Sequence, residues 1–245
     1  MRNIRLTIEY DGKCYNGWQK QPNKLNIQGE IEKVISSITG EEDINLIASG
    51  RTDAGVHALG QVANFKTNSQ IPIEKFAIAI NSKLKRSIVI KKAEEVDERF
   101  HSRLSCKKKT YRYIINNSPE GTAIYRNLET HIPQKLDLSQ MKKAIKYFEG
   151  EHDFKAFKAS GTSSKSSVRT IYKADIYQEN EKIFIEITGN GFLYNMVRIL
   201  IGTLVEVGEG KRAPDSIPAI LDSLDRLQAG VPMPPQGLTL ETVLY

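Results

Sequence analysis

The sequence is poor in the residues that build disulfide frameworks and structural metal sites. Cys14 and Cys106 are the only cysteines among 245 residues, and they form no CxxC pattern. This argues against a disulfide-stapled fold and against a structural zinc site. It favours a reducing compartment.

Long apolar runs are missing as well. No stretch reaches the roughly 18 consecutive apolar residues that a transmembrane helix requires. The N-terminal residues, MRNIRLTIEYDG, alternate between apolar and polar side chains and lack the continuous apolar region of a signal peptide. We therefore expect a cytoplasmic protein that does not associate with membranes.

Motifs for metals and nucleotide cofactors are also lacking. The four histidines have neither HExxH nor HxH spacing: His57, His101, His131 and His152. No GxSxG elbow occurs, and the GNG and GEG triplets lack the further glycine and the context of dinucleotide-binding and phosphate-binding loops. We expect neither a bound metal nor a cofactor.

Positive charge is what the chain has in excess. Its 35 Lys and Arg residues exceed its 29 Asp and Glu residues, which gives a formal charge of +6 and a pI near 9.1. Such a balance favours polyanionic partners, although a soluble protein with a merely basic surface has the same composition. With 40% hydrophobic residues, the chain can bury one large core or two modest ones.

The first half of the chain alternates between strand and helix patterns. Residues 4–10 carry apolar side chains at every second position, which predicts a strand. Apolar residues at helical spacing from Ile27 predict a helix, with Gly40 as its C-cap. Further strands near 43–49, 61–67 and 87–94 and a helix near 73–84 complete a β-α-β-β-α-β order.

The second half repeats this order. Predicted strands cover 111–115, 171–177, 183–188 and the terminal LTLETVL, and a helix follows the capping-box pattern of Asp137 and Gln140. A long helix is predicted over 193–207, and a short one through Ile220. We predict an α+β fold of two similar ferredoxin-like halves with mainly antiparallel sheets and helices on one side. The predicted domains are residues 1–105 and 106–245.

A polar, serine-rich and basic segment lies between residues 158 and 169. Its composition predicts a mobile loop, in which Lys165 and Arg169 are candidates for closing over a phosphate backbone.

The segment ASGRTDAGVHALGQVANF, residues 48–65, is the strongest candidate for a functional loop. It places Arg51 and Asp53 between two predicted strands, where rigid edges present loop side chains. Taken alone, an RTD triplet more often forms a turn that holds a local ion pair.

Several motifs resemble one known family. GRTDAGVHA, residues 50–58, is similar almost letter for letter to the signature of the TruA-type tRNA pseudouridine synthases. EYDGKCYNGWQKQP (9–22), KTYRYII (109–115), EGEHDFKAF (149–157) and GNGFLYNMVRILIGTL (189–204) resemble the family's other motifs, in its order. The resemblance covers essentially the whole chain, with no departure at a motif position.

The resemblance implies an activity and its residues. Asp53 would be the catalytic carboxylate, Tyr111 would stack on the target uracil, Arg198 would pair with the carboxylate, and Arg51 would contact the flipped nucleotide or its backbone. The substrates would be uridines at positions 38, 39 and 40 of tRNA, in the anticodon stem-loop. The protein would be a homodimer without a cofactor. The tRNA would lie across both subunits, in an RNA-binding cleft between the two halves of the chain.

Alternative interpretations remain at this stage. Without the motifs, the simpler interpretations are that Tyr111 is a core aromatic of an alternating strand and that Arg198 is a helix residue that extends to solvent. Paired ferredoxin-like halves with basic aromatic strands also suit a non-catalytic RNA-binding protein. A carboxylate in a basic cleft argues against plain binding, because it repels phosphate. The positive charge and the lysine run CKKK argue against a small-molecule isomerase or hydrolase.

Overall fold

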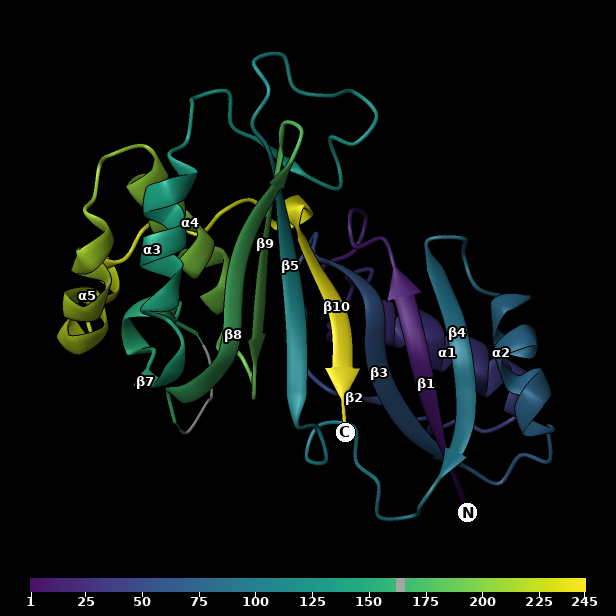
Figure 1. Ribbon diagram of the computed structural model, residues 1–245. Helices are drawn as coiled ribbons and strands as arrows, with labels where there is room; N and C mark the ends of the chain where they lie inside the picture. Colours follow the sequence, from purple (N-terminus) through teal and green to yellow (C-terminus); the bar gives the residue numbers. More distant parts are fainter. Residues whose placement is uncertain (162–165) are drawn as a thin grey trace. The chain divides into compact units, whose positions relative to one another are not determined.

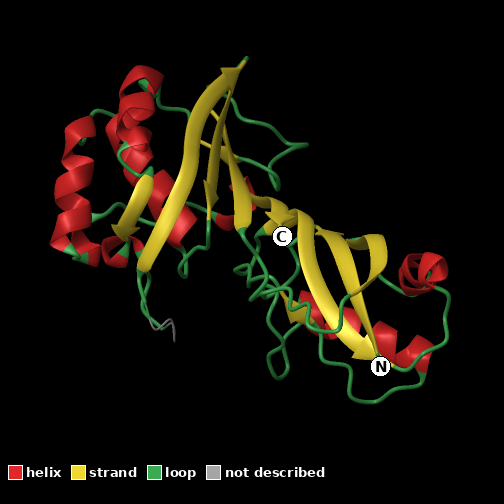
Figure 2. Cartoon of the chain, turned by 60° about the horizontal axis from the view of Figure 1, so that its bottom comes forward, coloured by secondary structure: helices red, strands yellow, loops and turns green. Residues whose placement is uncertain are grey.

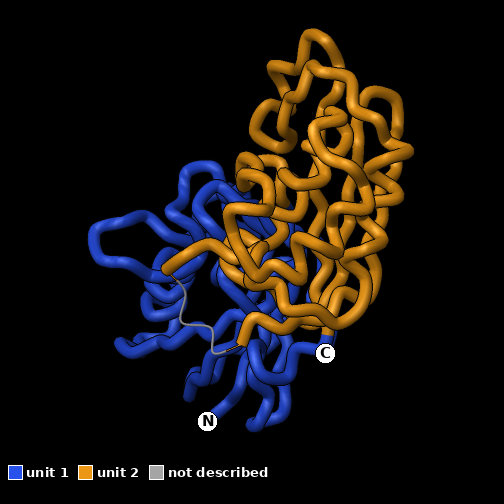
Figure 3. Tube along the Cα trace, turned by 90° about the vertical axis from the view of Figure 1, so that its left-hand side faces the viewer, with its two compact units in different colours: residues 1–107, 239–245 blue, residues 108–238 orange. Residues whose placement is uncertain are grey.

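The computed structural model describes residues 1–161 and 166–245, and the chain forms two compact units. Unit 1 comprises residues 1–107 together with 239–245, and unit 2 comprises residues 108–238 (Figure 3). The last strand therefore belongs to unit 1, whereas the predicted domains placed it in the second half. No helix within the described ranges is long and apolar enough to cross a bilayer.

Unit 1 is a small sheet with two helices (Figure 1). Its elements are β1 (Arg2–Tyr10), α1 (Ile27–Thr39), β2 (Ile47–Ala48), β3 (His57–Thr67), α2 (Ile73–Asn81), β4 (Ile88–Val96) and β10 (Leu238–Leu244). The strand order is β4-β1-β3-β10, and β2 also pairs with β3. β1 is antiparallel to both β3 and β4, whereas β10 is parallel to β3.

Side-chain alternation explains how unit 1 packs. Ile4, Leu6 and Ile8 of β1 are fully buried, while the residues between them are half-buried. α1 begins at an N-cap, Asn26, whose side chain accepts a hydrogen bond from a backbone amide of the first turn. It ends at Gly40, whose φ of 74° lies in the left-handed region that favours glycine. The Gly40 cap was predicted from the sequence, whereas the Asn26 cap was not.

Within its described residues, unit 2 contains the strands β5 to β9 and three α-helices. Its elements are β5 (Lys108–Asn116), β6 (Thr130–His131), α3 (Leu138–Lys146), β7 (Gly150–Asp153), β8 (Val168–Glu179), β9 (Lys182–Gly189), α4 (Met196–Gly208) and α5 (Ile217–Ser223), with short 3₁₀ turns among them. The order β5-β9-β8-β7 is antiparallel throughout, and β6 adds a short parallel pairing to β5. Figure 2 shows the helices of this unit gathered on one face of its sheet.

The predicted α+β class with mainly antiparallel sheets is confirmed. The helix predicted from Asp137 begins there, since this side chain accepts a hydrogen bond from the Gln140 amide. Two short strands, β6 and β7, were not predicted, and the strand expected over 43–49 is reduced to β2. Of the two candidate cations between residues 158 and 169, Arg169 lies in β8, and Lys165 lies outside the described residues.

Candidate active site

Asp53 lies in the loop that joins β2 to β3. Its side chain is half-buried, whereas Arg51 is exposed and Thr52 between them is buried. The loop turns tightly at this point, because the Val56 amide donates a hydrogen bond to the Asp53 carbonyl oxygen at 3.1 Å. The structure thus places two of the predicted site residues, Arg51 and Asp53, in one short loop, with Asp53 at the start of its turn.

The N-terminal motif, residues 9–22, packs its backbone against this loop. A Cβ atom at Gly12 would lie 2.0 Å from the Val56 carbonyl oxygen, and one at Gly17 would lie 2.6 Å from the Thr52 carbonyl oxygen. The Trp18 amide also donates to the Thr52 carbonyl oxygen at 3.1 Å. The glycines of this motif therefore allow two backbone segments to approach closely, which places Asp53 on a supported turn.

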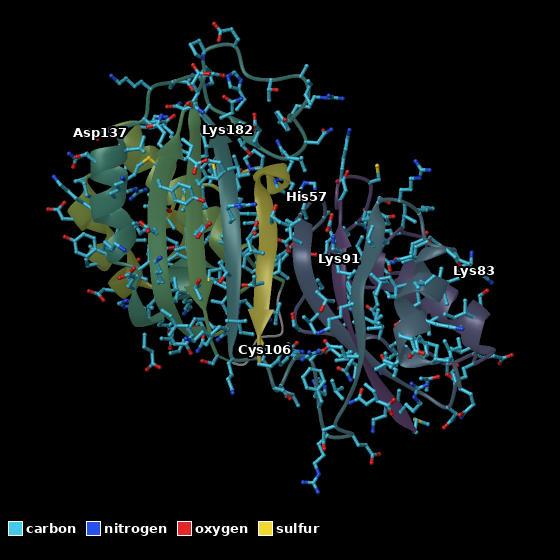
Figure 4. All side chains as sticks on the ribbon, turned by 45° about the vertical axis from the view of Figure 1, so that its right-hand side comes forward. His57, Lys83, Lys91, Cys106, Asp137 and Lys182 are labelled. Atoms are coloured by element: carbon cyan, nitrogen blue, oxygen red, sulfur yellow. The ribbon has the colours of Figure 1, made fainter. Side chains whose placement is uncertain are left out.

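His57 closes the loop at the start of β3 and is labelled in Figure 4. Its Nδ1 accepts a hydrogen bond from the Gly12 amide at 3.1 Å and lies at the same distance from an Asp11 carboxylate oxygen. The His57 side chain thus contacts two residues of the N-terminal motif, Asp11 and Gly12. This histidine anchors the loop to the N-terminal motif.

Tyr111 lies on β5 of unit 2 and is only 8% exposed. Its ring meets the ring of Phe192 edge to face, with centroids 5.2 Å apart and planes at 88°. This arrangement is a favourable geometry for aromatic pairs and fixes the orientation of the tyrosine ring. Phe192 belongs to the motif at residues 189–204, which therefore meets the motif at residues 109–115 here.

Arg198 lies in the first turn of α4, and its guanidinium is held in place. Its Nε donates to the Met233 carbonyl oxygen at 2.6 Å, and its Nη1 donates to the Asn195 Oδ1 at 2.7 Å. The Met233 amide donates back to the Arg198 carbonyl oxygen at 3.0 Å. A planar guanidinium held through two of its nitrogens has little freedom to turn.

Tyr113 ties the strand of Tyr111 to the segment that holds Arg198. Its hydroxyl lies 2.6 Å from the Thr130 Oγ1 and donates to the Pro234 carbonyl oxygen at 2.8 Å. Burial raises the pKa of Tyr113 far above its ordinary value, so the hydroxyl keeps its proton. In unit 2, the contacts of Tyr113 with Pro234 and of Arg198 with Met233 therefore connect the strand of Tyr111 to Arg198. The predicted pairing of Arg198 with Asp53 stays a prediction.

The lysine run before Tyr111 is only partly solvated. Lys107 and Lys108 are exposed, and Lys109 and Arg112 are half-buried. The Lys108 Nζ lies 4.9 Å from the centroid of the Tyr172 ring. Cations interleaved with aromatic rings are typical of surfaces that bind single-stranded nucleic acid.

The residues that the structure describes hold no group of three or more His, Cys, Asp and Glu side chains with the geometry of a metal site.

Comparisons with known proteins decide the family. A family model described as tRNA pseudouridine synthase matches residues 6–104 and 144–245. A tRNA pseudouridine synthase A of Caldicellulosiruptor saccharolyticus is 55% identical over the full length of both chains. A tRNA pseudouridine synthase A 2 of Clostridium perfringens is 52% identical, again over both full lengths. The chain belongs to the tRNA pseudouridine synthase family.

Membership of this family makes the chain an isomerase that acts on uridine in tRNA. It overturns the alternatives of a non-catalytic RNA-binding protein and of an enzyme for small molecules. Among solved structures, a chain of the archaeal box H/ACA sRNP Nop10-Cbf5 complex matches with a TM-score of 0.39 and 13% identity, over 82% of this chain and 44% of that one. This likeness is too remote to support an argument about the site.

Sequence reasoning missed the residues that hold the candidate site together. Phe192 and Asn195 lie inside a recognised motif, yet nothing in the spacing showed that they contact Tyr111 and Arg198. Gln61, a fully buried polar residue of β3, was likewise overlooked. Its signal is a glutamine in an otherwise apolar strand, which requires hydrogen-bond partners when buried.

Proposed function

We propose that this isomerase modifies uridines 38, 39 and 40 in the anticodon stem-loop of tRNA, with Asp53 as its catalytic carboxylate. The observation that carries the proposal is the geometry of the signature loop, residues 49–56 between β2 and β3. Asp53 lies on a turn of this loop, and the N-terminal motif packs its backbone closely against it. The chemistry of the reaction explains why such a carboxylate is needed.

Pseudouridine formation moves uracil from an N1 bond to a C5 bond. The bond between ribose C1′ and N1 breaks, the base turns, a bond from C1′ to C5 forms, and a proton leaves C5 while N1 gains one. Atoms and electrons balance without an oxidant or reductant. Cleavage gives the sugar a cationic character, which a nearby carboxylate stabilises, traps covalently or relieves by removing a sugar proton.

The uridine must leave its stacked position for Asp53 to reach C1′. We propose that Tyr111 then stacks on the extruded uracil and that Arg51 contacts the flipped nucleotide or its backbone. Arg198 is proposed to keep Asp53 ionised, because a neighbouring guanidinium opposes the rise in pKa that desolvation causes.

Mapping of the product tests the proposed function directly. We expect incubation with unmodified tRNA transcripts to yield pseudouridine at positions 38, 39 and 40 only. Transcripts with cytidine at all three positions serve as the control and should yield none. Pseudouridine confined to other parts of the tRNA would overturn the anticodon assignment.

Substitution of Tyr111 separates ring stacking from hydroxyl chemistry. Tyr111→Phe keeps the aromatic face, whereas Tyr111→Ala removes stacking that is worth about 1–3 kcal/mol per base. We expect tRNA binding to weaken more in the Ala variant than in the Phe variant, measured as the Kd of an unmodified transcript. Equal Kd values for the two variants would show that Tyr111 does not stack on the base.

Salt dependence tests the role of the lysine run. We expect log K for tRNA to fall steeply and linearly with log salt, because several phosphate contacts release counterions. Lys108→Ala should reduce the magnitude of the slope by about one. Lys33→Ala, at an exposed position of α1, is the matched control and should leave the slope unchanged. Equal slopes for the wild type and Lys108→Ala would remove Lys108 from the RNA surface.

We also propose that the protein acts as a cytoplasmic homodimer, with the tRNA lying across both subunits. The family resemblance and the excess of basic residues support this. Light scattering coupled to size-exclusion chromatography measures the mass directly, and a monomer at all concentrations would contradict the dimer.

A further inference from the structure

Two buried hydroxyl groups contact each other where the signature loop meets the end of β1. The Tyr10 hydroxyl, at the end of β1, is 2.7 Å from the Thr52 Oγ1. Tyr10 is 3% exposed, and Thr52 is 6% exposed. Thr52 is the residue immediately before Asp53, so this contact fastens the loop one residue from the carboxylate.

Gln61 fastens the beginning of the same loop. Its side chain is fully buried in β3, where Oε1 accepts a hydrogen bond from the Ser49 Oγ at 2.7 Å and Nε2 donates to the Gly50 carbonyl oxygen at 3.0 Å. Oε1 also accepts from the Val62 amide at 3.1 Å. The amide group of one side chain thus holds the two residues that open the loop.

Burial also determines the protonation state of Tyr10. Burial raises the pKa of Tyr10 to about 12, and the hydrogen bond with Thr52 only partly opposes that rise. The tyrosine is therefore a neutral hydroxyl at physiological pH. It serves as a hydrogen-bonding group and not as a base.

A β-bulge lies between Tyr10 and the residue opposite Gln61 in the pairing of β1 with β3. In the pairing of β1 with β3, Ile8 lies opposite Gln61, whereas Tyr10 lies opposite Ala58, so the register shifts between them. Bulges commonly re-aim side chains next to active sites. Here the shift occurs at the residues that support the loop.

We infer that Tyr10, Thr52 and Gln61 are positioning residues for the reaction, which fix the backbone of the signature loop and thereby aim the Asp53 carboxylate. The inference rests on the proposed catalytic role of Asp53. An aspartate side chain is short, so its carboxylate follows small movements of the backbone. A displacement of about 1 Å at a reacting group can reduce the rate about 100-fold.

Tyr10→Phe tests the inference, with Tyr15→Phe as the matched control. Tyr15 is also 3% exposed, and its hydroxyl makes a similar contact, 2.8 Å from the Ser87 Oγ. We expect Tyr10→Phe to lower the single-turnover rate about 10- to 100-fold without changing the Kd for tRNA. Tyr15→Phe should lose similar thermal stability and keep a rate near that of the wild type.

A second pair of variants keeps the test decisive if Tyr10→Phe folds poorly. Thr52→Val keeps the shape of the side chain and removes its hydroxyl, whereas Thr52→Ser keeps the hydroxyl. We expect Thr52→Val to lower the single-turnover rate as Tyr10→Phe does, and Thr52→Ser to restore most of it. Equal rates for Thr52→Val and Thr52→Ser would overturn the inference.

The remaining outcomes distinguish this inference from the proposed function. A wild-type rate in Tyr10→Phe, or equal slowing in Tyr10→Phe and Tyr15→Phe, would refute the positioning role. If Asp53→Asn is inactive in the same assay, the proposed function survives that result. Full activity of Asp53→Asn would refute the proposed function itself.

Discussion

Asp53→Asn is expected to abolish pseudouridine formation while the protein still folds and binds tRNA. The substitution keeps the size of the side chain and removes its charge. A neutral amide neither traps nor stabilises a cationic sugar and removes no sugar proton. Turnover should therefore fall by several orders of magnitude, as it does when essential catalytic groups are removed. The measurement is the single-turnover rate on an unmodified transcript.

The tRNA affinity of Asp53→Asn should not fall with its turnover. Removing one negative charge from a surface that faces phosphates leaves the tRNA affinity equal or slightly higher. Asp222→Asn, at an exposed position of α5, is the matched control and should change neither rate nor affinity. Thermal melting checks that Asp53→Asn is folded. A folded Asp53→Asn variant that still forms pseudouridine would refute the catalytic role of Asp53.

Local patterns predicted most elements of the fold because they depend on neighbouring residues. The alternation in β1, the helix from Ile27 to the Gly40 cap, and the cap at Asp137 are all encoded within a few positions. β6 and β7 have only two and four residues and depend on pairing with distant strands. β10 joins β3 by a parallel pairing across the length of the chain, which no local pattern specifies.

The residues of the candidate site also divide into those that the sequence predicted and those that it did not. Asp53, Arg51, Tyr111 and Arg198 were predicted from motif resemblance, because their residue types are characteristic of the chemistry. The supports were not predicted, since a buried glutamine or a threonine in a turn has many possible partners. Only the structure shows that Gln61 bonds to Gly50 and Ser49. The N-terminal motif was recognised without a role, and its glycines prove to be sites of close backbone approach.

Gly17→Ala should consequently disable the enzyme without altering any side chain that contacts RNA. Gly17 has a φ of +80°, and an added Cβ would lie 2.6 Å from the Thr52 carbonyl oxygen and 3.1 Å from the Ala54 amide nitrogen. The left-handed conformation costs a non-glycine residue about 1–2 kcal/mol. Displacing backbone in a packed region adds about 1–3 kcal/mol. We expect a total loss of about 2–5 kcal/mol in the free energy of unfolding.

Gly40→Ala isolates the part of this effect that comes from the close approach. Gly40 has a similar φ of +74°, but no atom lies within 4 Å of the Cβ position. This variant should lose only about 1–2 kcal/mol from backbone strain and keep its rate on tRNA. Gly17→Ala should also slow single turnover about 100-fold, because the segment it pushes carries Asp53. Equal stability losses and equal rates in the two variants would show that the N-terminal motif does not support the catalytic loop.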